Sequence, residues 1–383
     1  MRHLYYLVAL TVLNHVAMGA ARIVTSLYAL RLEASPAVIG VLIALFAILP
    51  MFLSVAAGRL SDRIGPRTPM MAGSLVLAIG AVLPFLLPGL PTLFVSSTLI
   101  GTGFVLYQVT VQHVIGFFGK PEDRTRNFSY FAIGMSISGL CGPIIAGFGF
   151  DSIGPTKTFL LVSVLPLIPL IIVALDKLRL PAVPHADASP GKRKVYDLFR
   201  DRRMRWVFAV TTLLAMAWDL YQFVMPIYGT QVGLSASRIG LVMGAFSAAT
   251  FLIRLALPAI VRHMSPWAML STALLLAAVM FTIFPFISSF GLLAATSFAL
   301  GLGLGSSQPT VMSLLHNAAP PGRAGEAVGM RATMINFSQT TLPLVFGGIG
   351  AAVGIGPVFW VMAASLVWGG LVARRRAQQE RRQ

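Results

Sequence analysis

An arginine, Arg22, and an aspartate, Asp219, stand inside long apolar runs of the sequence, where a charge is costly to bury. Asp219 is the only carboxylate placed deep within such a run. Burial favours the protonated form of a carboxyl group, whereas a neighbouring guanidinium favours the ionised form. Asp219 is therefore a candidate to bind and release a proton, or alternatively a fixed anion that neutralises Arg22. His15 is a second candidate for the proton, with a packing role as its alternative.

Uncharged polar and aromatic side chains occur in several other apolar runs. A few polar groups on mostly apolar walls are typical of sites that bind organic molecules, although a single Asn or Gln can instead bond a neighbouring helix. Arg254 continues a stripe of Met243, Ser247 and Thr250 at helical spacing, and a second cation would suit an anionic substrate. The predicted binding residues are Asn14, Arg22, Gln108, Gln112, Trp218, Tyr221, Gln222, Arg254, Gln308, Asn336 and Gln339.

The composition indicates where these side chains lie. Of 383 residues, 56% are hydrophobic and 11% are charged, and the mean hydropathy is +0.82, which excludes a soluble globular protein. The single cysteine, Cys141, excludes an intrachain disulfide and a multi-cysteine metal site. The sequence has no Walker-type glycine loop, no H-E-x-x-H and no nucleophile elbow. We therefore expect no enzyme activity, no cofactor and no metal.

Twelve apolar runs are long enough to cross a bilayer as helices. Most basic residues lie outside them on one side, so the positive-inside rule places both termini in the cytoplasm and accounts for the net charge of +17 without nucleic acid. A basic, proline-containing linker, 176–204, separates six spans, 1–175, from six more, 205–373, and a basic tail, 374–383, follows. The predicted spans are 4–30, 36–58, 68–87, 92–117, 127–150, 158–175, 205–229, 236–260, 268–288, 290–316, 327–352 and 356–373.

The two halves match at a constant offset of 200 residues. The matches are Tyr28 with Tyr228, Ser35 with Ser235, Gly101 with Gly301, Gln108 with Gln308, and Pro143 with Pro343. Such a register predicts a six-span unit duplicated in parallel, giving two pseudo-symmetric helical bundles. Arg22 corresponds to Gln222, one helical turn from Asp219, so an ion pair between Arg22 and Asp219 across the pseudo-two-fold axis is expected.

A loop motif follows the second predicted span: Gly58-Arg59-Leu60-Ser61-Asp62-Arg63-Ile64-Gly65-Pro66-Arg67. It resembles the cytoplasmic loop signature of the major facilitator superfamily, G-x-L-a-D-R-x-G-R-R, with Ser61 and Pro66 as departures. The resemblance implies an all-α fold of two six-helix bundles and secondary transport by alternating access. It also implies a cytoplasmic gate formed by Gly58, Asp62, Arg63, Gly65 and Arg67, to which Arg331 at the start of the eleventh span is added.

The fifth predicted span carries Gly134, Gly142, Pro143 and Gly147. This spacing is similar to the antiporter motif of the drug-exporting branches of that superfamily, and it favours proton-coupled export of drugs or metabolites. Uptake of a small organic anion, such as a carboxylate, is the alternative, followed by a transporter-like receptor or a membrane enzyme. The expected partners are a small organic substrate, H+ and the lipid bilayer, and the expected setting is a monomer in the bacterial inner membrane.

Overall fold

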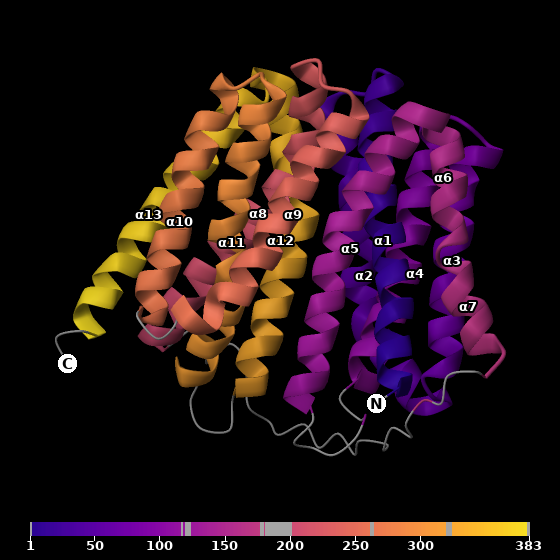
Figure 1. Ribbon diagram of the computed structural model, residues 1–383, viewed down its shortest axis with the longest axis horizontal. Coiled ribbons are helices and arrows are strands. Elements are labelled where there is room, and N and C mark those ends of the chain that lie inside the picture. Colours follow the sequence, from indigo (N-terminus) through magenta and orange to yellow (C-terminus); the bar gives the residue numbers. More distant parts are fainter. Residues whose placement is uncertain are drawn as a thin grey trace. The chain divides into compact units, whose positions relative to one another are not determined.

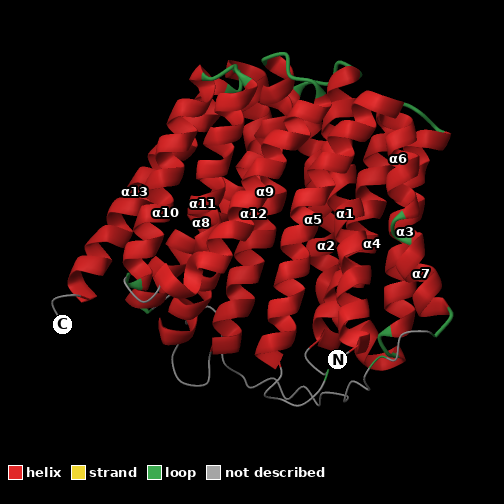
Figure 2. Ribbon diagram, viewed as in Figure 1, coloured by secondary structure: helices red, strands yellow, loops and turns green. Residues whose placement is uncertain are grey.

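The structure is a computed structural model that describes residues 2–115, 118, 124–176, 180, 201–260, 264–318 and 324–380. The burial and contacts of some helix residues, Gly58 and Asp62 among them, are outside the description. Throughout the described ranges the regular structure is helical, with thirteen α-helices and one short 3-10 helix and no strand (Figure 2). The contacts divide the chain into two compact units.

The first unit comprises Met1–Ala188 and the segment Gly229–Gly244. Its sixth span is broken at Pro166, which has no N–H to donate, and the amide of Leu165 bonds the carbonyl of Val162 at 3.3 Å instead of continuing the α-helical pattern. The span predicted over 158–175 is therefore present as two consecutive helices, which together cover Pro155–Ala174. Its helices, indigo to magenta in Figure 1, are α1 (Arg2–Arg31), α2 (Pro36–Ile64), α3 (Arg67–Leu86), α4 (Leu90–Ile115), α5 (Arg124–Ile153), α6 (Pro155–Val164) and α7 (Leu167–Ala174).

The second unit comprises Ser189–Tyr228 and Ala245–Gln383. Its last helix continues through the basic residues that follow the predicted span end at 373, so most of the predicted tail is helical. The helices in this half of the chain are α8 (Arg202–Gln231), α9 (Ala236–Ile260), α10 (Pro266–Ile283), η3 (Phe284–Phe286), α11 (Phe290–Ala318), α12 (Ala324–Val353) and α13 (Gly356–Glu380). The first residues of α9 belong to the first unit.

Eleven segments of the described chain are long and apolar enough to cross a membrane, and α6 and α7 together make one of them. The twelfth predicted span, 327–352, falls on α12, where several side chains lie outside the description. The predicted all-α polytopic fold of paired six-helix bundles is confirmed.

The duplication is visible in the helix boundaries of the two halves. Both ends of α1 and α8 differ by 200 residues, and so do both ends of α5 and α12. Ser35 caps α2 by accepting the Val38 amide at 3.4 Å, and Ser235 accepts the Arg238 amide at 3.4 Å at the start of α9. The ring of Tyr28 meets Phe159 edge-on at 6.5 Å, and the ring of Tyr228 meets Phe359 in the same way at 5.4 Å, again 200 residues on.

The close packing of α3 on α4 has a looser counterpart in α10 on α11. A β-carbon added at Gly103 would lie 2.6 Å from the carbonyl oxygen of Gly73, so the two backbones touch. In the second unit a β-carbon at Gly303 would lie 3.3 Å from the carbonyl oxygen of Ala273. Ala273 stands 200 residues after Gly73, so α10 carries a methyl group at the position where α3 has none.

Candidate functional site

A hydrogen bond between two predicted site residues joins α1 to α4. Nε2 of His15 lies 2.7 Å from Oε1 of Gln108, and the imidazole meets the ring of Phe104 edge-on at 4.6 Å. Because an amide oxygen only accepts, Nε2 carries the proton in this bond, and Nδ1 of the neutral ring keeps a lone pair. The arrangement holds the imidazole of His15 against α4.

One face of α1 borders open space. His15, Gly19 and Arg22 share this face at helical spacing, and all three are half-buried. A β-carbon added at Gly19 would meet no atom within 4 Å. The imidazole and the guanidinium therefore stand two turns apart on either side of a glycine, which adds no side chain between them.

Asn14 and Gln112, two other predicted binding residues of this unit, have different surroundings. Asn14 is fully buried, and its amide nitrogen donates to the hydroxyl of Ser74 on α3 at 3.3 Å. Asn14 therefore ties two helices together, which is the alternative that applies to any polar residue in a span. Gln112 is exposed, one turn beyond Gln108 on α4.

Asp219 lies on α8 in the second unit with only 4% of its surface exposed, and it is the one buried carboxylate among the described residues. The neighbouring Trp218 is half-buried and meets Phe246 edge-on at 4.8 Å. Tyr221 is stacked on the same Phe246 at 4.5 Å and is fully buried, so it belongs to the aromatic core rather than to an open wall. Gln222 is half-buried.

The stripe that led to Arg254 is a packing surface. Thr250 donates to the carbonyl of Phe246 at 3.0 Å, and its Cα would lie 2.7 Å from a β-carbon added at Gly305 of α11. Met243 and Ser247 are buried as well. The interpretation of the stripe as a cavity wall is therefore wrong, and Arg254, itself half-buried, remains a candidate through its charge alone.

The other predicted binding residues of the second unit lie on α11 and α12. Gln308 is exposed next to Pro309, whereas Asn336 and Gln339 are half-buried. The backbone carbonyl of Asn336 accepts the hydroxyl of Thr340 at 3.1 Å, which leaves its side-chain amide out of that bond. The binding set as a whole stays a prediction, and so does the ion pair between Arg22 of the first unit and Asp219 of the second.

Part of the predicted cytoplasmic gate can be located. Gly65 ends α2 with a φ of 79°, a left-handed conformation that favours glycine. The burial and contacts of Gly58 and Asp62 lie outside the description. Arg67 forms an ion pair with Asp176 at 3.2 Å and donates to the carbonyl of Ala174 at 2.7 Å, so it anchors the end of α7 inside its own unit.

The remaining gate arginines lie in different surroundings. Arg63 is exposed at the end of α2. Arg331 is half-buried on α12, and its Nη1 lies 4.0 Å from the sulfur of Met312 on α11. The gate therefore stays a prediction.

The glycines of the fifth span form close helix contacts. A β-carbon at Gly134 would lie 2.8 Å from Val8 of α1, and one at Gly142 would lie 3.4 Å from the amide nitrogen of Ala20. A β-carbon at Gly147 would overlap the carbonyl oxygen of Ala236. These glycines let α5, which also contains Pro143, pack tightly against α1 and against the first turn of α9 within the first unit.

Sequence reasoning missed the role of Asp151. Its carboxylate accepts the amide of Ala236 at 3.2 Å and that of Ser237 at 2.7 Å, so an acid at the end of α5 caps the N-terminus of α9. Asp151 corresponds to Ala351 in the other half. An acid present in only one copy of the repeat was the feature of the sequence that could have indicated a special role for Asp151. Within the described residues, no cluster of three metal-ligating side chains occurs.

Proteins related to this chain in sequence include some that are named for drug resistance. The chain is 22% identical over 354 residues to the multidrug resistance protein MdtG of Dickeya zeae, covering 88% of this chain and 85% of the relative. It is 20% identical over 335 residues to the quinolone resistance protein NorA of Staphylococcus aureus, covering 86% and 84%.

Solved structures share the fold. A POT family transporter in complex with a thioalcohol-conjugated peptide has a TM-score of 0.83 at 15% identity, with 99% of this chain and 96% of that chain covered. The nucleoside transporter NupG has a TM-score of 0.79 at 13% identity, with 97% and 99% covered.

The family model for the Major Facilitator Superfamily matches residues 7–327 and 266–383. This match covers nearly the whole sequence, and the duplicated helical units agree with it. The chain belongs to the Major Facilitator Superfamily, and it is a multi-pass membrane transporter of small molecules and not an enzyme.

Proposed function

We propose that the protein exports small, largely apolar organic molecules in exchange for protons, by alternating access. The drug-resistance relatives support export, and so does the glycine packing of α5, whose spacing resembles the antiporter motif. The observation that carries proton coupling is Asp219, a buried carboxylate in the middle of a membrane-spanning helix. Such a group is costly to keep ionised away from water, so its protonation can follow the exposure of the site to either side.

We assign candidate substrate groups to each unit separately. From the first unit we assign His15, Gln108 and Arg22, because their face of α1 borders open space. From the second unit we assign Trp218 and Gln222, which flank Asp219 and are half-buried. A wall with one aromatic ring and few hydrogen-bonding groups suits organic compounds of varied shape better than a single polar metabolite.

The proposed setting is a monomer in the bacterial inner membrane, with both termini and the linker 176–204 in the cytoplasm. The excess of basic residues in the linker and the tail supports this orientation. The segment 58–67, whose first part including Asp62 forms the end of α2, then lies on the cytoplasmic side, where its resemblance to the family signature supports a gating role.

Uptake of a small organic anion is the second candidate function. Arg22 and Arg254 are both half-buried within spans, whereas Asp219 is the one buried carboxylate among the described side chains. Two cations against one anion favour a substrate that carries a negative charge.

Transport by the purified protein in liposomes with an imposed pH gradient tests the proposal. The assay follows a lipophilic cationic dye and, separately, an aromatic carboxylate. We expect the wild type to accumulate the dye against its gradient only while the pH gradient lasts. Dye movement that is independent of the pH gradient would contradict proton coupling, and accumulation of the carboxylate alone would favour the second candidate.

Asp219→Asn separates the two roles of this residue. The neutral amide imitates only the protonated acid, so a proton carrier should lose gradient-driven accumulation but keep downhill exchange. If Asp219 only neutralises Arg22, the variant should lose all flux, and adding Arg22→Gln should restore it. Glu33→Gln, which removes an exposed carboxylate between α1 and α2, is the matched control and should behave as wild type. Full pH-driven accumulation by Asp219→Asn would leave His15 as the carrier.

A further inference from the structure

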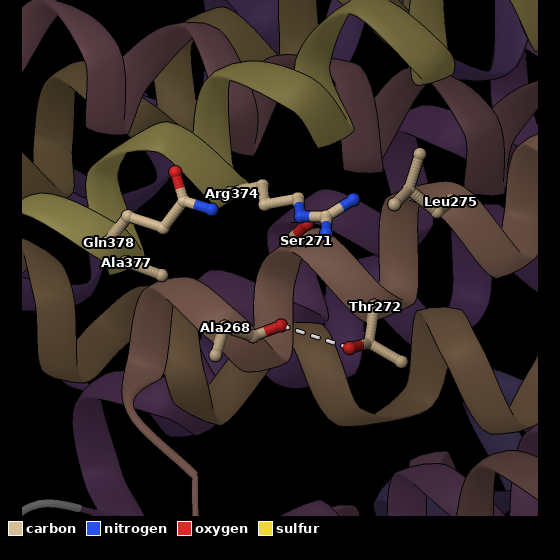
Figure 3. A pocket seen from close by; sticks show the side chains of 7 residues that line it. All are labelled: Ala268, Ser271, Thr272, Leu275, Arg374, Ala377 and Gln378. Atoms are coloured by element: carbon tan, nitrogen blue, oxygen red, sulfur yellow. Dashed lines mark hydrogen bonds between the residues drawn. The ribbon is translucent and has the colours of Figure 1, made fainter.

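A pocket of about 390 Å³ lies between α10 and α13 of the second unit. It is separate from the transport residues described above, and its walls come from the beginning of α10 and the end of α13. Figure 3 shows the guanidinium of Arg374 reaching across it above Ser271, with the amide of Gln378 on the same side. The side chains that matter here are Ser271, Thr272 and Leu275 from α10 and Arg374, Ala377 and Gln378 from α13.

The pocket lies where the apolar part of α13 gives way to charge. The 25 residues of α13 span about 37 Å at about 1.5 Å per residue, which exceeds a hydrocarbon core of about 30 Å. Trp206 and Trp368 pack together at 6.2 Å between ring centroids, and the guanidinium of Arg376 lies 5.5 Å from the Trp206 ring centroid. Tryptophan gathers at the membrane–water interface, so Arg374 lies at the depth of the lipid headgroups.

The donors that remain in the pocket suit a phosphate. The hydroxyl of Ser271 donates to the carbonyl of Gly370 at 2.9 Å, and that of Thr272 donates to Ala268 at 3.0 Å. Both hydroxyl protons are therefore used, and Arg374 and Gln378 provide the free N–H groups. No carboxylate lines the pocket, and none of the described carboxylates pairs with Arg374. The planar guanidinium fork can hold two phosphate oxygens at once.

An apolar strip leads from the membrane to this donor pair. Val367 and Leu371 share the face of α13 on which Arg374 and Gln378 lie, and their side chains are 42% and 47% exposed. Leu275 continues the apolar wall on α10. A free phosphate would use only the polar end, whereas a phospholipid would place its phosphate on Arg374 and its acyl chain along the strip.

We propose that this pocket binds an anionic phospholipid, with the phosphate on Arg374 and Gln378 and one acyl chain along Leu371 and Val367. An anionic lipid suits the site because Arg374 is a cation and no carboxylate lies among the residues that line the pocket. The lipid would fasten the end of α13 to α10 without entering the transport path.

The test is the rise in unfolding temperature of the detergent-solubilised full chain on titration with phosphatidylglycerol. We expect Arg374→Gln to raise the half-saturating lipid concentration by about fivefold or more, since it removes the guanidinium fork that would hold the phosphate oxygens. Arg375→Gln is the matched control because it removes the same charge from the next, exposed position outside the pocket. Its half-saturating concentration should stay within about twofold of the wild type, because Arg375 does not line the pocket and forms no fork with the phosphate there.

Two further titrations identify the ligand. Phosphatidylcholine should give no comparable rise, because its headgroup has no net charge, and glycerol 3-phosphate should give none, because it lacks acyl chains. Equal losses for Arg374→Gln and Arg375→Gln would show a general surface attraction and overturn the proposal. A full effect from glycerol 3-phosphate would replace the lipid by a soluble phosphate and would also overturn it.

Discussion

Gly103→Ala should destabilise the first unit by about 2 kcal/mol. The new methyl group would lie 2.6 Å from the Gly73 carbonyl oxygen and would overlap the backbone amide of Leu77, so no side-chain rotation can make room for it. Overpacking costs about 1–3 kcal/mol and occasionally more, and a backbone obstacle puts this site at or above the upper end. Alanine regains about 1 kcal/mol over glycine within a helix.

Gly303→Ala provides the comparison inside the same chain. Its methyl group would lie 3.3 Å from the Ala273 carbonyl oxygen and 3.4 Å from the tip of Leu276, which can move. The small strain and the gain in helix propensity nearly cancel, so the stability should change by less than about 1 kcal/mol.

Thermal unfolding in detergent, followed by tryptophan fluorescence, measures the difference. About 2–4 °C per kcal/mol is usual for domains of this size, so Gly103→Ala should lower the Tm by about 4–8 °C. Gly303→Ala should shift the Tm by less than about 4 °C, and Gly19→Ala, with no atom within 4 Å, should keep or raise it. Equal losses at Gly103 and Gly303 would refute the link between Gly73 and the closer approach of α3 and α4.

Three other changes have defined outcomes. Asp151→Ala should lower stability by about 1 kcal/mol in the same thermal assay because it removes the cap of α9, and Asp151→Asn should lose less because its amide oxygen still accepts. Replacing His15 and Gln108 by alanine, singly and together, should show a coupling of about 1 kcal/mol in a double-mutant cycle, whereas additive effects would exclude the bond between them. Asp176→Asn should cost less than about 1 kcal/mol, because its ion pair with Arg67 is exposed and Arg67 keeps its carbonyl partner; a larger Tm loss would contradict this.

Much of the fold could be predicted from the sequence because hydropathy and charge act on whole segments. The helix ends were harder to predict, since hydropathy marks only the part of a helix that crosses lipid. Thus α5 begins at Arg124 and α13 ends at Glu380, both beyond the apolar runs. The break in the sixth span depends on how α6 and α7 pack around Pro166, and proline within a span does not always interrupt it, as α5 shows at Pro143.

The candidate site was predictable in its residue types more than in its contacts. Helical spacing places Arg22 and His15 on one face of α1, and the structure keeps them there. Spacing within one helix says nothing about the rotation of its neighbours, so the bond of His15 to Gln108, 93 residues away, could not be foreseen. For the same reason the stacking of Tyr221 on Phe246 could not be foreseen.

The shared helix boundaries of the two halves bear on how the gene has been able to change since its duplication. The turns that follow α1, α5, α8 and α12 are short, and they reuse the same left-handed positions, Glu33 with Gly233 and Gly154 with Gly354. One residue inserted into a helix before such a turn would rotate everything after it by about 100° and carry its lipid-facing side chains toward the protein interior. Selection against insertions and deletions is therefore expected to be strict from Ser35 to Gly154, while the linker between the halves is free to vary in length.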